Sequence, residues 1–156
     1  MILLFLFSNL KFLSKRSLIL VIIQFTCLAY FLFFERFLTG GFLLIVQFTG
    51  FVVALWGVWA MKIRNFNIQP EIKSSAVFVN KGPYKLIRNP MYFGLITFFG
   101  SILFYNFTWK NFVIYLILCT VLYLKIEMEE KFLTEKFGSN YTVYLTNTYR
   151  IIPFVY

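Results

Sequence analysis

The sequence contains no histidine, and only 13% of its 156 residues are charged. Histidine is the commonest side-chain general base, the usual zinc ligand and the usual proximal haem ligand, so its absence argues against metal and haem enzymes. No Gly-x-Gly-x-x-Gly occurs among the eight glycines, which excludes a Rossmann-type nucleotide site. Cys27 and Cys119 lie inside apolar stretches, where burial as small hydrophobic side chains is commoner than a disulfide or a metal site. We predict no metal site.

Hydrophobic residues make up 60% of the chain and aromatic residues 22%, which is more than a soluble domain of this length carries. The composition predicts an all-α integral membrane protein with a single domain, residues 1–156. Crossing the hydrocarbon core takes roughly 20 helical residues. Four apolar stretches approach that length: 17–34, 41–61, 91–107 and 112–128. The last two are short, so we expect them to recruit flanking residues or to thin the bilayer locally.

Only Thr108 to Asn111 separates the last two stretches, which predicts a tight hairpin of antiparallel helices. After Met128, charged and apolar residues alternate as far as Gly138. This pattern predicts a C-terminal amphipathic helical segment with a stop at the glycine. Beyond it come three tyrosines that are typical of a segment at the level of the lipid headgroups, Tyr141, Tyr144 and Tyr149.

The net charge of +9 comes from cations that flank the apolar stretches, without the interleaved aromatic patch of a nucleic-acid binder. We therefore expect the lipid bilayer, and not a nucleic acid, as the partner of these charges. Four spans leave Arg36 and Lys110 on one side, with Lys125 inside the last span and every other Lys and Arg on the opposite side. The positive-inside rule then places both termini and the 62–90 loop in the cytoplasm.

Two charged segments stand at helix ends on that predicted cytoplasmic side. The polar run Gly82 to Gly94 leads into the third apolar stretch, and the cluster Lys125 to Glu130 closes the fourth. Because a short hairpin returns the chain to the same membrane face, we expect the two segments to meet there. Together they form the candidate active site.

At the entrance of the third span, Asn89 is predicted to be the helix N-cap and Pro90 the first helical residue. Asparagine accepts hydrogen bonds from free amides there, and proline lacks the donor that would be left without a partner. The helix dipole beside Arg88 then suits a carboxylate or a phosphate. Arg88 fits a topology anchor equally well.

Near the exit of the fourth span, Lys125 and Glu129 are one helical turn apart and share a face, while Glu130 lies on a different one. Acidic groups near a membrane helix end are costly unless they are paired or functional. We predict ligand roles for Glu129 and Glu130. The alternative is structural, with Lys125 snorkelling to the interface and Glu127 paired with Lys131.

Three further residues around the helix entrance have two open interpretations each. Tyr84 and Tyr92 could stack on a flat heterocycle, although tyrosines are common at membrane interfaces. Gly94 lies one turn inside the helix, where glycine is unfavourable unless something approaches the backbone closely. That neighbour is either a ligand or another helix.

Several of these residues form spaced motifs: Gly82-Pro83-Tyr84, Arg88-Asn89-Pro90-Met91-Tyr92-x-Gly94, Glu129-Glu130, Phe137-Gly138-x-x-Tyr141-x-x-Tyr144 and a late Pro153. In these motifs the chain resembles the isoprenylcysteine carboxyl methyltransferase family. The wider group includes membrane phospholipid N-methyltransferases. The resemblance covers about residues 69–153.

Members of that family use S-adenosylmethionine, bound between the cytoplasmic ends of the last two hydrophobic helices and the segment before them. The resemblance therefore implies this cofactor and a set of contacts: Tyr84, Asn89, Pro90, Tyr92 and Glu129, with Gln69 and the backbone of residues 76–79. Asn89 stands where many members have histidine, and Lys125 where eukaryotic members carry an arginine implicated in substrate handling. Lys125 keeps the charge but loses the bidentate fork.

The chemistry of the acceptor favours methylation of a carboxyl oxygen. A carboxylate, with a pKa of roughly 3.5, is already ionised at neutral pH and needs no general base. An amine, as in phosphatidylethanolamine methylation, must first lose a proton to Glu127, Glu129 or Glu130. We expect Arg88 and Lys125 to attract the acceptor or the cofactor carboxylate, and Glu129 to fix the cofactor.

The acceptor predicted in this way is an isoprenylcysteine-like or other lipidic carboxylate that enters from the bilayer. Phospholipid N-methylation is the main alternative. A non-catalytic membrane scaffold is the competing class, and sterol reduction with a nicotinamide cofactor is a third possibility. The sequence does not indicate the oligomeric state.

Overall fold

The structure is a computed structural model that describes residues 15–65 and 77–153, with the side chains of 62–65 left out. Six helical elements follow one another: α2 (Lys15–Phe34), α3 (Phe42–Asn65), the 3₁₀ helix η2 (Gly82–Lys85), α4 (Pro90–Tyr105), α5 (Trp109–Phe137) and α6 (Ser139–Asn147). Within the described ranges there is no strand, and the only β-type pairing is a parallel bridge between Ile87 and Tyr149. The all-α prediction is confirmed.

Each of the four predicted spans is overlapped by one helix, α2, α3, α4 or α5. Three are long and apolar enough to cross a membrane, namely Lys15–Phe34, Phe42–Met61 within α3, and Trp109–Phe137, while Pro90–Tyr105 is a shorter apolar helix. At 1.5 Å per residue the 16 residues of α4 reach only about 24 Å. This is below the roughly 30 Å of a hydrocarbon core, as expected for the third span.

Helix α5 is much longer than the predicted span 112–128. It runs unbroken for 29 residues to Phe137. Strong helix formers, glutamate and lysine among them, continue the helix beyond the apolar part. It ends at Gly138, whose φ of 54° lies in the left-handed region that favours glycine. The amphipathic segment and its stop are thus confirmed, but the segment is the last part of α5, and α6 is a separate helix.

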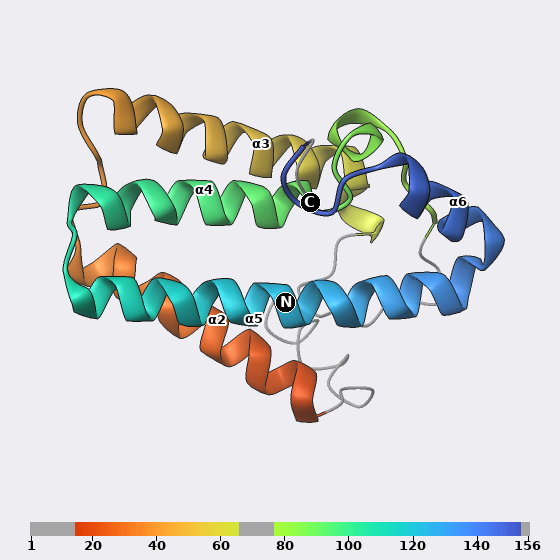
Figure 1. Ribbon diagram of the computed structural model, residues 1–156, viewed down its shortest axis with the longest axis horizontal. Helices are drawn as coiled ribbons and strands as arrows, with labels where there is room; N and C mark the ends of the chain where they lie inside the picture. The colour runs from red at the N-terminus through yellow and green to blue at the C-terminus, as the bar shows by residue number, and fades with distance from the viewer. Residues whose placement is uncertain (1–14, 66–76, 154–156) are drawn as a thin grey trace.

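Helix α4 lies between α3 and α5, while α2 crosses α5 obliquely (Figure 1). The predicted hairpin of α4 and α5 is present, because the two helices are antiparallel and only residues 106–108 join them. Thr108 caps α5, since its Oγ1 accepts a hydrogen bond from the Asn111 amide at 3.1 Å. The most extensive packing, however, is between α3 and α4, and α5 packs mainly against α2.

Glycines allow the close contact of α3 with α4. A Cβ atom added at Gly94 would lie 2.6 Å from the Ala54 Cβ and 2.6 Å from the Gly50 carbonyl oxygen. Small residues let membrane helices approach in this way. The close neighbour that we expected at Gly94 is therefore helix α3.

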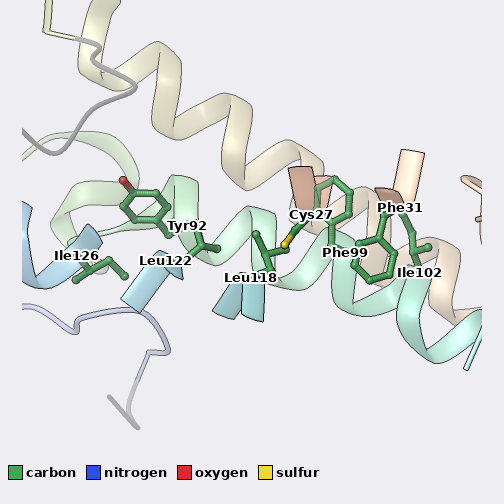
Figure 2. Packing of buried hydrophobic residues seen from close by; sticks show 8 residues of the cluster. All are labelled: Cys27, Phe31, Tyr92, Phe99, Ile102, Leu118, Leu122 and Ile126. Carbon is green, nitrogen blue, oxygen red and sulfur yellow. The ribbon is translucent and has the colours of Figure 1, made fainter. Parts of the chain in front are cut away.

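The hydrophobic core lies between α2, α4 and α5 (Figure 2). Phe31 and Ile102 are fully buried in it, and Leu118, Leu122 and Ile126 line the facing side of α5. Toward one end of this core lies Tyr92, the only cluster member among the predicted site residues. The core therefore fixes the first turn of α4 against the last part of the apolar stretch of α5.

Candidate functional site

The two charged segments meet, as the sequence predicted. The Arg88 Nε lies 3.0 Å from the Glu130 Oε1, and the Tyr92 hydroxyl donates a hydrogen bond to Glu129. The entrance of α4 and the charged part of α5 therefore converge at one end of the helical bundle. We call this the site end.

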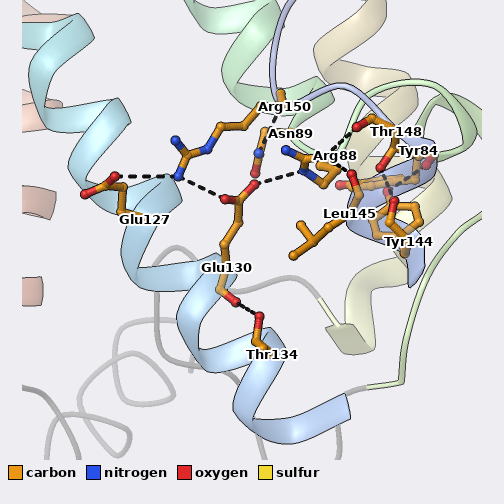
Figure 3. Close-up of polar contacts among 10 residues, drawn as sticks. All are labelled: Tyr84, Arg88, Asn89, Glu127, Glu130, Thr134, Tyr144, Leu145, Thr148 and Arg150. Carbon is orange, nitrogen blue, oxygen red and sulfur yellow. Dashed lines mark hydrogen bonds and ion pairs between the residues drawn. The ribbon is translucent and has the colours of Figure 1, made fainter. Parts of the chain in front are cut away.

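Glu130 is the centre of an ion-pair cluster (Figure 3). One carboxylate oxygen faces Arg88, and the other lies 2.9 Å from the Arg150 Nη2. All three side chains are only 13–14% exposed, and ion pairs shielded from water in this way are screened little by salt. We call Arg88, Asn89, Glu130 and Arg150 the Glu130 clamp. From the sequence, Arg150 is predicted only as one of the cytoplasmic cations that set the membrane topology. Its position between Tyr149 and the late Pro153 is the one local feature that pointed to a further role.

Arg88 also fastens the end of α6. Its Nη1 donates to the carbonyl of Leu145 at 2.9 Å and to the carbonyl of Thr148. Its backbone amide donates to the Tyr149 oxygen at 2.8 Å. The last carbonyls of a helix lack partners within the helix, so a guanidinium there satisfies them. In this structure Arg88 positions α6, and its role toward an anionic ligand stays a prediction.

Helix α4 begins at Pro90 with Asn89 as its N-cap, as predicted. The expected capping contact was wrong, because the Asn89 side chain makes no hydrogen bond to the first turn. Instead its Nδ2 donates to the Arg150 carbonyl at 3.0 Å. The C-terminal segment runs beside the entrance of α4 and offers an acceptor that the local sequence does not show.

Beside the clamp lies a second group of side chains, which we call the Glu129 cluster: Tyr84, Tyr92, Lys125 and Glu129. The Lys125 ammonium is 5.5 Å from the centroid of the Tyr92 ring, whose hydroxyl is bonded to Glu129. Lys125 and Glu129 thus share one side of α5, as their spacing predicted.

Lys125 does not snorkel to the interface, contrary to the structural alternative. Its side chain is 1% exposed, and its Nζ donates to the Gln24 Oε1 at 2.7 Å. Gln24 belongs to α2, and the sequence analysis gave it no role. The sequence did offer a clue to this contact. A polar side chain in the middle of an apolar span is costly in a membrane unless it has a partner.

Tyr84 carries a buried donor that no described residue satisfies. The residue is 4% exposed, and its hydroxyl has no hydrogen-bond partner in the described part of the chain. Burial, and then the negative charge of Glu129 and the neighbouring Tyr144, raise the pKa of Tyr84, so the hydroxyl keeps its proton at neutral pH. The backbone of Tyr84 is held in place, because its carbonyl accepts from the Tyr144 hydroxyl at 2.6 Å.

One other structural expectation was wrong. Glu127 does not pair with Lys131 among the described ion pairs, and instead lies 3.8 Å from Arg150 and accepts from the Tyr123 hydroxyl at 2.8 Å. The placement of the C-terminal tyrosines at the level of the lipid headgroups stays a prediction. Tyr141 is 2% exposed, and it packs with Tyr144 against the ring of Phe78.

That aromatic contact brings part of the segment before α4 to the site end. Phe78 comes from the 76–79 segment, for which backbone contacts with the cofactor were predicted, and its ring also packs on Phe137. Gln69 and Ala76 lie outside the described residues. Their predicted contacts stay predictions.

The arrangement offers a buried hydroxyl donor, a carboxylate and two aromatic rings beside the ion pairs of the Glu130 clamp. A family model described as phospholipid methyltransferase matches residues 36–140, which is about two thirds of the chain. The match includes α3, η2, α4, α5 and the first residues of α6. A comparison with curated proteins found no match.

Proposed function

The chain belongs to the phospholipid methyltransferase family and is a membrane methyltransferase, and from this premise we propose that it uses S-adenosylmethionine to methylate the carboxylate of a lipidic acceptor. The acceptor class that we favour is an isoprenylcysteine-like carboxylate. The site end is assigned to the cytoplasmic face, because most cations of the chain belong to that side.

The buried hydroxyl of Tyr84 is the observation that carries the proposal. A donor shielded from water without a partner costs free energy, and a bound molecule with an acceptor group would satisfy it. S-adenosylmethionine has such acceptors in its ribose and its carboxylate, and it has hydroxyl and ammonium donors that suit the carboxylate of Glu129. The Glu129 cluster therefore fits this cofactor.

In this proposal each predicted site residue has a role in binding the cofactor or in holding the site together. Glu129 and Tyr84 hold polar groups of the cofactor, while Tyr92 orients Glu129 through the hydroxyl bond. Asn89 and Pro90 form the wall at the entrance of α4. Gln69 and residues 76–79 complete the predicted contacts. Gly94 contributes by letting α4 approach α3.

The cofactor supplies an electrophilic methyl group on a positively charged sulfur. The chain must mainly align the acceptor with it and exclude water. Lys125 and Arg88 attract the acceptor carboxylate or that of the cofactor. A carboxylate requires no base, and this agrees with Glu130, whose two oxygens are both held by arginines.

The description of the family model favours a second candidate, N-methylation of a phospholipid amine. An amine is protonated at neutral pH, so this reaction needs a proton acceptor. Glu129 would have to accept the proton, since both oxygens of Glu130 are held in ion pairs.

The acceptor class is tested with membranes that contain the protein and a methyl donor with a radiolabelled methyl group. Carboxyl methylation gives label that mild base releases as methanol, whereas label that stays in lipid after base treatment indicates an amine. Membranes without the protein are the control. Base-stable lipid label alone would overturn the carboxylate proposal in favour of the second candidate.

The site itself is tested by calorimetric binding of S-adenosylhomocysteine to the detergent-solubilised protein. Glu129→Ala should abolish saturable binding while membrane insertion is retained. Glu135→Ala, an exposed glutamate farther along the same helix, is the matched control and should bind normally. If the unchanged protein shows no saturable heat, the proposed cofactor site fails and the alternative of a non-catalytic scaffold is favoured.

A further inference from the structure

A groove of about 640 Å³ lies between the beginning of α2 and the last part of α5. Apolar side chains from both helices line it: Ile19, Leu20, Leu124 and Met128. Its volume is in the range of roughly 300–1,000 Å³ that is usual for small-molecule sites. Ile19 is 54% exposed and Leu124 41% exposed, so this lining is available to a ligand.

The polar part of the groove is mainly cationic. Arg16, Lys131 and Arg150 line it together with a single acid, Glu127. Glu127 lies 3.8 Å from Arg150, so part of its charge is already compensated. Apolar walls with an excess of cations match an amphiphile whose head is anionic.

The groove is separate from the Glu129 cluster. Successive residues of an α-helix are about 100° apart around its axis. Glu127 and Lys131 are each two residues from Glu129, so both lie about 160° away from it around α5. A headgroup in the groove therefore lies on the far side of α5 from the proposed methyl-transfer site and is not the acceptor.

We propose that this groove binds an anionic glycerophospholipid, with the headgroup phosphate between Arg16, Lys131 and Arg150 and an acyl chain along the apolar walls. Arg16 lies in the first turn of α2, the first described helix, and Lys131 follows the apolar part of α5, so both belong near one membrane interface. The phosphate links the two helices by charge, in addition to their apolar contacts.

Arg150 connects this lipid site with the Glu130 clamp. Its Nη2 is 2.9 Å from Glu130, and its carbonyl accepts from Asn89. A lipid phosphate beside Arg150 thus contacts the residue that holds both the entrance of α4 and the acid of α5. Anionic lipid should accordingly stabilise the site end.

The test titrates phosphatidylglycerol and phosphatidylcholine with identical acyl chains into the detergent-solubilised full chain and counts bound lipid by native mass spectrometry. Phosphatidylglycerol should bind in preference. The double variant Arg16→Gln/Lys131→Gln should bind it about 25-fold more weakly, since each Lys or Arg near an anionic lipid surface contributes about fivefold in affinity.

The matched control is Lys81→Gln/Lys85→Gln, which removes the same charge from two exposed lysines outside the groove and should leave binding unchanged. Met128→Trp, which fills the groove without altering any charge, should also displace the lipid. Equal binding of both lipids, or equal loss in both double variants, would overturn the proposal. None of these readouts involves methyl transfer, so the result is independent of the proposed reaction.

Discussion

The two ends of the helical bundle are held together in different ways. At the site end, Arg88, Glu130 and Arg150 form shielded ion pairs between the entrance of α4, helix α5 and the C-terminal segment. At the opposite end, which we call the hairpin end, the contacts are mostly between neutral groups. The Tyr30 hydroxyl donates to the Asn111 Oδ1 at 2.9 Å, and the Asn111 Nδ2 donates to the Asn106 carbonyl at 2.7 Å.

This difference separates a structural junction from a site. Neutral hydrogen bonds suffice at the hairpin end, where Asn111 joins the turn carbonyl of Asn106 to the Tyr30 hydroxyl of α2. Shielded ion pairs add little net stability, because desolvation offsets much of the attraction. The chain nevertheless has them beside the unsatisfied hydroxyl of Tyr84 and the carboxylate of Glu129. Charges placed where stability does not require them support the proposal that the site end binds a ligand.

The largest effect is expected from breaking the clamp. Glu130→Gln removes the carboxylate that Arg88 and Arg150 share and leaves Arg150 the more distant Glu127 at 3.8 Å. Removal of one partner of a shielded pair costs about 3 kcal/mol. Unfolding of the detergent-solubilised protein, followed by circular dichroism, measures this loss. Glu135→Gln, which removes an exposed acid from the same helix, should change stability by less than about 0.5 kcal/mol. Equal losses of stability in the two variants would show that the ion pairs of Glu130 contribute no more than an exposed glutamate does.

The next effect concerns Gln24 and Lys125, which join α2 to the site end. Gln24→Leu should cost about 2 kcal/mol, because it removes a hydrogen bond to a charged group and leaves the ammonium without that acceptor. Adding Lys125→Met should recover most of the loss, since an apolar pair needs no partner. The four proteins of this double-mutant cycle are compared by the free energy of unfolding. Additive losses would contradict the coupling.

The hairpin end provides the matched comparison. Asn111→Ala removes the hydrogen bonds to Asn106 and Tyr30 and should cost about 1.5 kcal/mol. Because the substitution lies at the far end of the bundle, binding of S-adenosylhomocysteine should not change. A stability loss with a parallel loss of binding would mean that the two ends are coupled, and the separation argued above would fail.

The sequence predicted the features that depend on nearest neighbours along the chain. The apolar stretches predicted the helices, and Gly138 predicted the end of α5. The short connection at Thr108 predicted the hairpin. The meeting of Arg88 and Tyr92 with the acids of α5 followed from that hairpin, and the contacts confirm it.

The features that the sequence analysis missed depend on segments distant in the chain. Gln24 is 101 residues from Lys125, and Asn89 is 61 residues from Arg150. No local pattern links these pairs, because their contact depends on how α2 and the C-terminal segment pack against the hairpin. The Asn89 prediction failed for the same reason, since a capping rule considers only the residues of its own helix.

The smallest expected effect tests the unsatisfied hydroxyl. Tyr84→Phe removes a buried donor that has no described partner, so stability should stay the same or rise by up to about 1 kcal/mol. Binding of S-adenosylhomocysteine should weaken about fivefold, the contribution of one hydrogen bond. Burial, and then the Glu129 charge, raise the pKa of Tyr84, so its hydroxyl stays protonated. The difference in affinity between the unchanged protein and Tyr84→Phe should therefore be constant between about pH 7 and about pH 9.

Tyr115→Phe is the matched control and should show the reverse pattern. Its hydroxyl donates to the Ile96 carbonyl at 2.9 Å within the helical bundle. Its removal should lower stability by about 1 kcal/mol and leave binding unchanged. If Tyr84→Phe instead destabilised the protein as Tyr115→Phe does, while binding stayed normal, the hydroxyl of Tyr84 would be a structural donor. The difference between the two ends of the bundle would then no longer point to a ligand.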